Sequence, residues 1–144
     1  MKILFVCRGN VGRSQMGEEI FRQLTKGEYE TFSAGTSVYD KEGVSQDGKK
    51  LGDLTAANEV VNSLKEIGVD AGDNVRTQLT LEMVEEADKI IVMAEPETIP
   101  DYLKNSDKVT YWEVVDPKGM DQQDTNQIRD QITELVKGFI GNIR

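Results

Sequence analysis

Histidine is absent from this chain of 144 residues, and cysteine occurs once, at Cys7. Without histidine, a serine–histidine–aspartate triad and a histidine-ligated metal are both excluded, and one cysteine excludes an internal disulfide or a cysteine-rich zinc site. An unpaired thiol suits a reducing compartment. The apolar run at residues 3–6 is too short for a signal peptide or a membrane span, and charge follows at Arg8. A cytoplasmic protein without a metal or cofactor is therefore expected.

Basic residues are outnumbered by acidic ones. The chain has 17 lysines and arginines against 26 acidic residues, which leaves a net charge of −9. A surface of this charge repels nucleic acid and anionic membranes, so neither is expected as a partner. It also repels a phosphorylated substrate at long range, so any phosphate site has to supply its own local positive field.

What the chain does have is an alternation of strand-like and helix-like segments. Strands are expected at residues 2–7, 30–34, 89–94 and 109–115, and helices at 16–24, 57–67, 80–87, from Pro96 onward, and 128–143. Residues 38–54 are rich in glycine and aspartate and predict a long loop. The alternation predicts an α/β fold with a mostly parallel sheet covered on both faces. Such sheets bind ligands at the carboxyl ends of their strands, and Cys7 lies at one of these ends.

The loop of residues 7–14, called the Cys7 loop below, joins the first expected strand to the first expected helix. One interpretation is a buried structural cysteine in a turn. The alternative is an anion site, because amides at a helix N-terminus bind oxyanions, and Gly9 and Gly12 let the backbone approach closely. Arg13 would contact two phosphoryl oxygens, and cations beside a helix N-terminus favour the thiolate of Cys7. Ser14 would donate to this sulfur, cap the helix, or do both. The candidate phosphate-binding residues are Arg8, Gly9, Asn10, Val11, Gly12, Arg13 and Ser14.

A second chemical feature is the pair Asp116-Pro117. A cysteine nucleophile needs a proton donor for the departing oxygen, and with no histidine a carboxylic acid is the natural choice. Asp116 follows the last expected strand, and Pro117 restricts the backbone of the residue before it. Because the chain has 26 acidic residues, position alone leaves an ordinary loop aspartate as the alternative.

With these residues in place, the chain resembles the low-molecular-weight protein tyrosine phosphatases. The central match is the motif Val6-Cys7-x-Gly9-Asn10-x-x-Arg13-Ser14 between a strand and a helix. Further matches lie at residues 32–36, 75–76, 79–80, 86–93 and 116–117, so nearly the whole chain is covered. The resemblance implies one domain over residues 1–144, with a twisted four-stranded parallel sheet flanked by helices, flavodoxin-like and of the phosphotyrosine phosphatase I type.

The resemblance also implies an activity, namely cysteine-dependent hydrolysis of phosphate monoesters, in first place protein phosphotyrosine. Cys7 would form a thiophosphate, Asp116 would act as general acid and base, and Arg13 would stabilise the phosphoryl oxygens. The expected partner is a phosphorylated protein or a small aryl phosphate, and the expected state is a monomer or a weak dimer.

Supporting roles follow from the same resemblance. The residues expected to brace the Cys7 loop are Asn10, Ser14 and Ser33, with Asp73 in place of a histidine that animal members use. The residues expected around the substrate pocket are Tyr39, Pro117 and Lys118. Tyr39 equally suits a plain surface position, and Lys118 a solvated charge.

One departure from the family concerns Gly12. Most members carry a second cysteine at this position, and it traps an oxidised nucleophile as a disulfide. Without that cysteine, peroxide is expected to carry Cys7 to irreversible oxidation products. Activity lost to peroxide should therefore recover poorly in dithiothreitol, and complete recovery after prolonged exposure would contradict this prediction.

Other departures leave the substrate open. Many members have aromatic residues after the Asp-Pro pair, whereas residues 118–120 here contain none, which weakens the case for phosphotyrosine. Val11 is expected to face the pocket, near a position at which phosphoarginine phosphatases differ from tyrosine phosphatases. An arsenate reductase is a further alternative, although only one that uses an external thiol, because thioredoxin-coupled enzymes need two more cysteines. A non-catalytic phosphopeptide or phosphate binder is the last.

Overall fold

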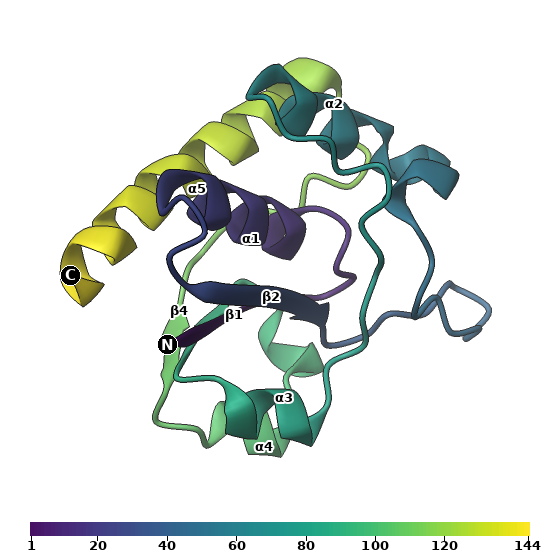
Figure 1. The fold of residues 1–144 in the computed structure, drawn as a ribbon. Helices are drawn as coiled ribbons and strands as arrows, with labels where there is room; N and C mark the ends of the chain where they lie inside the picture. The colour runs from purple at the N-terminus through teal and green to yellow at the C-terminus, as the bar shows by residue number, and fades with distance from the viewer.

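The computed structural model describes residues 1–144 and contains one sheet of four parallel strands in the order β2-β1-β3-β4 (Figure 1). The strands are β1 (Lys2–Cys7), β2 (Glu30–Gly35), β3 (Lys89–Val92) and β4 (Val109–Tyr111). In the ladder, Cys7 lies opposite Gly35, and Val6 lies opposite Val92. The α/β fold with a four-stranded parallel sheet is therefore confirmed.

Helices cover both faces of the sheet (Figure 1). One face carries α1 (Arg13–Leu24), α2 (Asn58–Glu66) and α5 (Gln122–Ile143), and the other carries the shorter α3 (Leu81–Glu86) and α4 (Asp101–Lys104). Single 3-10 turns occupy Leu51–Asp53, Thr55–Ala57 and Pro96–Thr98. No helix combines the length and the apolar character that a membrane span requires.

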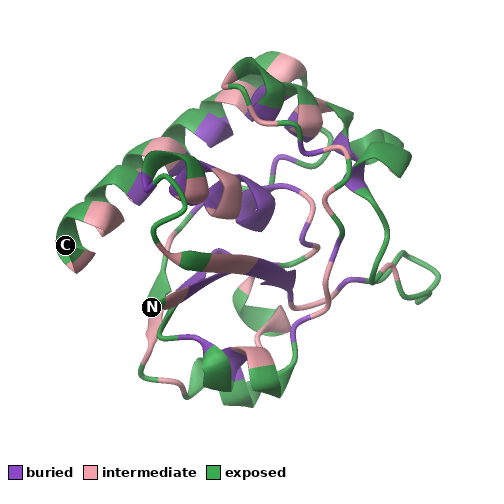
Figure 2. Cartoon of the chain, viewed as in Figure 1, coloured by how far each residue is buried: buried purple, intermediate pink, exposed green.

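β1 is a central strand that is buried from Ile3 to Cys7 (Figure 2), and its two faces contribute to two separate cores. Ile3, Phe5 and Cys7 pack toward α1, α2 and α5, whereas Leu4 and Val6 pack toward α3 and α4. All of them are at most 2% exposed. Burial on both faces explains why this strand is a continuous apolar run instead of an alternating one. It also holds the end of β1, and with it Cys7, in a fixed position.

The strand expected over residues 89–94 ends at Val92, and two other expected elements are shortened further. The strand expected over residues 109–115 ends at Tyr111, because its only neighbour, β3, ends at Val92, and the amide of Trp112 makes the last bond of the ladder. The helix expected from Pro96 is a single 3-10 turn, and α4 starts only after Pro100. Pro100 restricts the residue before it, Ile99, to extended backbone, so the 3-10 turn ends at Thr98 and cannot continue as a helix.

Candidate active site

The Cys7 loop begins at the carboxyl end of β1 and is held by the chain that follows β2. The amides of Thr36 and Ser37 donate to the carbonyl oxygens of Cys7 (2.9 Å) and Arg8 (2.8 Å). Gly35 makes this contact sterically possible, since a Cβ at this position would lie 2.7 Å from the Arg8 oxygen. The Ala-Gly-Thr segment at the end of β2 is therefore the support on which the loop rests.

The thiol of Cys7 lies at the base of this loop and is 2% exposed. Its Sγ is 3.0 Å from the hydroxyl oxygen of Ser14. That oxygen already accepts a hydrogen bond from Asn10 Nδ2 at 2.7 Å, which leaves the hydroxyl hydrogen of Ser14 free. An ionised sulfur can only accept, so the Ser14 hydroxyl is placed to donate to a thiolate.

Asn10 organises the interior of the loop. It is fully buried and has a φ of 54°, in the left-handed region that asparagine tolerates better than most residues. Its Nδ2 also donates to Ser33 Oγ at 3.0 Å, and its Oδ1 accepts the amide of Thr77 at 2.8 Å. The structure therefore brings together the three residues expected to brace the loop, Asn10, Ser14 and Ser33.

The backbone amides of the loop differ from its side chains in their hydrogen bonding. From Gly9 to Ser14, none of them donates a hydrogen bond inside the protein. Some of these groups belong to the first turn of α1, whose amides have no partner within the helix. Unbonded amides at a helix N-terminus form a site for an oxyanion.

Arg13 is the cation of the loop and is 4% exposed. Its Nη1 donates to the carbonyl oxygens of Met93 and Val114, and its Nη2 donates to the carboxylate of Glu95 at 2.7 Å. Its Nε–H has no partner inside the protein, so a donor remains for an oxyanion. These three acceptors thus fix the orientation of the guanidinium, and Glu95 balances its charge.

Asp116 and Pro117 close the site from the side of β4. One carboxylate oxygen of Asp116 lies 3.8 Å from Nη2 of Arg13, and the other accepts the amide of Lys118 at 3.0 Å. Pro117 is buried against Gly12, and a Cβ on Gly12 would lie only 2.9 Å from the proline Cγ. In this chain the Asp-Pro segment therefore packs directly on the glycine of the Cys7 loop, and a side chain at Gly12 would have to displace the Pro117 ring.

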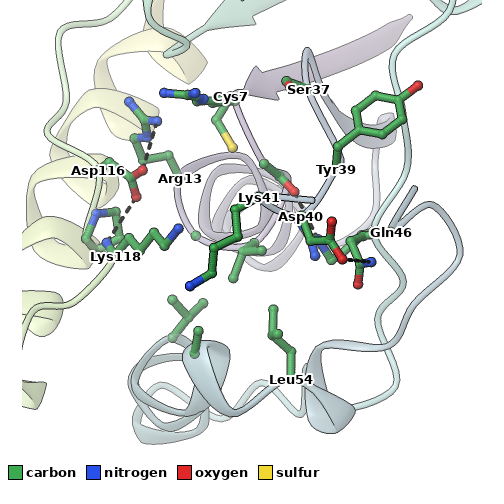
Figure 3. Close-up of a pocket in the computed structure, with 18 of the residues that line it drawn as sticks. Cys7, Arg13, Ser37, Tyr39, Asp40, Lys41, Gln46, Leu54, Asp116 and Lys118 are labelled. Carbon is green, nitrogen blue, oxygen red and sulfur yellow. Dashed lines mark hydrogen bonds and ion pairs between the residues drawn. The ribbon is translucent and has the colours of Figure 1, made fainter. Parts of the chain in front are cut away.

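Together these segments enclose a pocket of about 520 Å³ (Figure 3). Figure 3 shows Arg13 and Asp116 on one side of the Cys7 sulfur and Tyr39 on the other, with the tyrosine hydroxyl pointing away from the sulfur. Tyr39 is half exposed, and Lys118 is exposed. The four residues expected at the pocket wall all belong to its lining, namely Val11, Tyr39, Pro117 and Lys118. Beyond Gly12 the wall becomes more apolar, with Leu54, Ala56 and Val60.

Comparison with known proteins identifies the family of this arrangement. Residues 2–144 match the family described as low molecular weight phosphotyrosine protein phosphatase. The chain belongs to this family. An arsenate reductase of Bacillus cereus is 31% identical over 95% of this chain and 92% of its own.

Solved structures agree with the family. A mutant of YwlE from Bacillus subtilis is 28% identical with a TM-score of 0.76, over 99% of this chain and 98% of that one. A low molecular weight protein tyrosine phosphatase from T. tengcongensis is 27% identical with a TM-score of 0.79, over 99% of both chains. A YwlE arginine phosphatase with a phosphorylated active-site serine is 26% identical with a TM-score of 0.79, over 99% of this chain and 95% of that one. The chain is thus a phosphatase of the low molecular weight family.

In this phosphatase the structure reveals two site residues to which the sequence assigned no role, although residues 75–76 are among the matches to the family. Glu95 orients Arg13, and its only sequence signal is its place shortly after the end of β3. Arg76 is 7% exposed, lines the pocket and donates from Nε to the carbonyl oxygen of Gly9 at 3.1 Å. Burial lowers the pKa of the Arg76 guanidinium, and the negative charge of Cys7 acts in the opposite direction.

The prediction for Asp73 was wrong. Its side chain is 93% exposed and pairs with Lys50 at 3.6 Å, outside the bracing network. The neighbouring Asn74 points inward instead, and its Nδ2 donates to Gln15 Oε1 at 3.3 Å. Gln15 in turn donates to the carbonyl oxygen of Asn10 at 3.2 Å. The charged residue takes the solvated position and the neutral amide the half-buried one, as the cost of burying a charge requires.

No cluster of side chains that could hold a metal ion is present.

Proposed function

We propose that this phosphatase hydrolyses phosphate monoesters through a thiophosphate intermediate on Cys7, with Asp116 as general acid and base. The observation that carries the proposal is the position of the sulfur. It lies 3.0 Å from the Ser14 hydroxyl, in one pocket with the unbonded loop amides, Arg13 and Asp116. Such surroundings favour a nucleophilic thiolate, whereas a structural cysteine does not require an oxyanion site beside it.

The first step transfers the phosphoryl group. The thiolate of Cys7 attacks phosphorus, the S–P bond forms, and the bond from phosphorus to the leaving oxygen breaks. Asp116, in its protonated form, donates its proton to that oxygen. Its carboxyl group is 44% exposed at the pocket, so an incoming ester reaches it directly.

The second step releases phosphate. Asp116 removes a proton from a water molecule, whose oxygen attacks phosphorus and breaks the S–P bond. The Ser14 hydroxyl stabilises the departing thiolate, and the loop amides and Arg13 Nε stabilise charge on the phosphoryl oxygens in both steps. Glu95 acts through Arg13 as a positioning residue, because it fixes the plane of the guanidinium.

For the natural substrate, protein phosphotyrosine is proposed first and phosphoarginine second. The apolar wall at Leu54, Ala56 and Val60 gives a ring or an aliphatic stem a surface to pack on. Tyr39 supplies an aromatic side chain at the rim, half exposed. Phosphoarginine is supported by the likeness to the YwlE arginine phosphatase and by the acidic rim residues Asp40, Glu42 and Glu59, which suit a guanidinium.

The test is hydrolysis of a chromogenic aryl phosphate in the presence of EDTA, followed by matched peptides that carry phosphotyrosine or phosphoarginine. Turnover is expected in the native protein, and rapid denaturation in base should trap phosphate on Cys7, detected by mass spectrometry. Cys7→Ser should show no turnover. Hydrolysis by Cys7→Ser, or its absence in the native protein with every substrate, would overturn the proposal and favour a phosphate-binding protein.

A second candidate is arsenate reduction, favoured by the 31% identity to an arsenate reductase. Arsenate would bind where phosphate binds, since the two oxyanions share geometry and charge. With one cysteine in the chain, an external thiol has to supply the reducing electrons. Formation of arsenite that depends on both glutathione and Cys7, without phosphatase turnover, would select this candidate.

A cytoplasmic location, a single domain over residues 1–144, and a monomer or weak dimer complete the proposal. The scarcity of cysteine and the acidic surface support the first, and the one continuous sheet supports the second.

A further inference from the structure

The three buried arginines of this protein differ in how their charge is balanced. They are Arg13, Arg76 and Arg129. Arg13 pairs with Glu95, and Arg129 pairs with Glu66 and Asp130. Arg76 takes part in no ion pair, although it is as deeply buried as the other two. A buried charge is costly unless an opposite charge or strong hydrogen bonds stabilise it, so the missing partner of Arg76 needs an explanation.

The surroundings of Arg76 point to an anion in the pocket. Its backbone is held on both sides, by Lys49, which accepts its amide, and by Gly48, which donates to its carbonyl oxygen. Nε is used by the carbonyl oxygen of Gly9, and Nη2 lies next to Gly9, where a Cβ would be 3.6 Å away. Nη2 therefore lies against the Cys7 loop, and neither terminal nitrogen has a protein acceptor. Burial lowers the pKa of Arg76, and the one group that acts in the opposite direction is Cys7 in its ionised form.

Arg13 and Arg76 thus reach the same pocket with different net charge. Glu95 cancels the charge of Arg13, so Arg13 serves mainly as an oriented donor. Arg76 carries its full charge to the loop. In a protein of net charge −9, the unbalanced charge of Arg76 supplies the local positive field that a phosphate site requires.

We propose that Arg76 is a second oxyanion-binding arginine of this site, whose charge is balanced by the Cys7 thiolate in the free protein and by the phosphoryl group in the complex. The proposal rests on the proposed function for its choice of anion. It adds a residue that neither the motif nor the resemblance assigns. The alternative is that Arg76 only supports the loop through the Gly9 carbonyl.

Arg76→Gln separates the two roles, because a glutamine amide is still able to donate to the Gly9 carbonyl oxygen but carries no charge. The probes are iodoacetamide, which alkylates Cys7, and inorganic phosphate, which protects Cys7 when it binds. The variant should bind phosphate roughly tenfold more weakly, the loss expected when a charged hydrogen-bond partner is removed. Alkylation without phosphate should also slow at neutral pH. Arg76→Lys, which keeps the charge, should retain part of the affinity.

Arg129→Gln is the matched control, since Arg129 is a buried arginine outside the pocket. It should lose stability to urea and keep its affinity for phosphate. If Arg76→Gln behaves in the same way, the proposal is overturned and Arg76 is a support of the loop. The proposal is also overturned if phosphate fails to protect Cys7 of the native protein from alkylation.

One measurement needs no variant. Addition of phosphate to the native protein should shift the side-chain Nε–H resonance of Arg76 in an NMR spectrum and leave that of Arg129 in place. An unmoved Arg76 resonance at saturating phosphate contradicts the proposal. None of these readouts requires turnover, so a protein that hydrolyses no ester disproves the proposed function while Arg76 is still judged on binding.

Discussion

Between residues 7 and 14, Asn10, Arg13 and Ser14 are buried and hydrogen-bonded within the protein, whereas Tyr39 and Lys118 across the pocket are exposed. The Cys7 loop and the rim of the pocket, formed by Tyr39 and the segment from Asp116 to Lys118, therefore have different roles. In the proposed function, the preformed loop binds the phosphoryl group, which every substrate shares. The rim meets the leaving group, which differs among substrates, and its side chains are left free to adapt. The geometry of the loop accordingly says which reaction class fits, and the rim decides which ester enters.

Asp116 is the rim residue on which the loop chemistry depends most. Asp116→Asn should lower kcat for an aryl phosphate by about a hundredfold or more, the contribution of a positioned general acid. The loss should be larger for a phenyl ester than for a nitrophenyl ester, because the nitrophenolate departs without a proton. Asp107→Asn, at an exposed aspartate outside the pocket, is the control and should match the native protein. Equal losses for both esters would remove Asp116 from the role of acid.

Asn10 tests how far the loop is preformed. Asn10→Ala removes both donors to Ser14 and Ser33 and leaves the amide of Thr77 without its acceptor. The free energy of unfolding in urea should fall by about 2 kcal/mol, mostly from the unsatisfied groups. Asn10→Gly should lose about 1 kcal/mol less than alanine, because glycine adopts the positive φ of this position without strain. Identical losses in both variants would mean that the backbone conformation at Asn10 carries no cost.

Gly12 is where the loop and the rim touch. Gly12→Ala should lower kcat by roughly tenfold, because a methyl group there displaces Pro117 and misplaces Asp116. Pro117→Ala removes the ring atoms that the new methyl group meets, so the double variant should regain part of the activity. Two independent, additive losses would show that this contact does not position the acid.

Tyr39 and Lys118 should produce the smallest effects. Tyr39→Ala should raise KM for an aryl phosphate by about threefold, the scale of one exposed aromatic contact, and Lys118→Ala should change KM for an acidic phosphopeptide more than for a small ester. Tyr111→Ala, at an exposed tyrosine of β4, is the control. A fall in kcat with an unchanged KM would mean that these residues act on the loop and not on the leaving group.

Much of the fold and the centre of the site were predictable because they are local in the chain. Strand β1, the Cys7 loop and helix α1 follow one another, so an apolar run, two glycines and a helical period predict an anion site with Cys7 and Arg13 in it. The strand lengths were less predictable. The end of β4 depends on where its neighbour β3 stops, and the period of a sequence carries no information about that.

By itself, the sequence predicted the class of fold and the Cys7 loop as a candidate anion site, since each rests on residues that are adjacent or periodically spaced. Only the tertiary structure decided that Glu95 neutralises Arg13, that Pro117 rests on Gly12, that Arg76 lines the pocket beside the Cys7 loop, and that Asp73 lies in solvent. These pairings join segments far apart in the chain. They depend on how the strands cross over and on which side chain of a loop turns inward, and burial and charge settle both only once the sheet has formed.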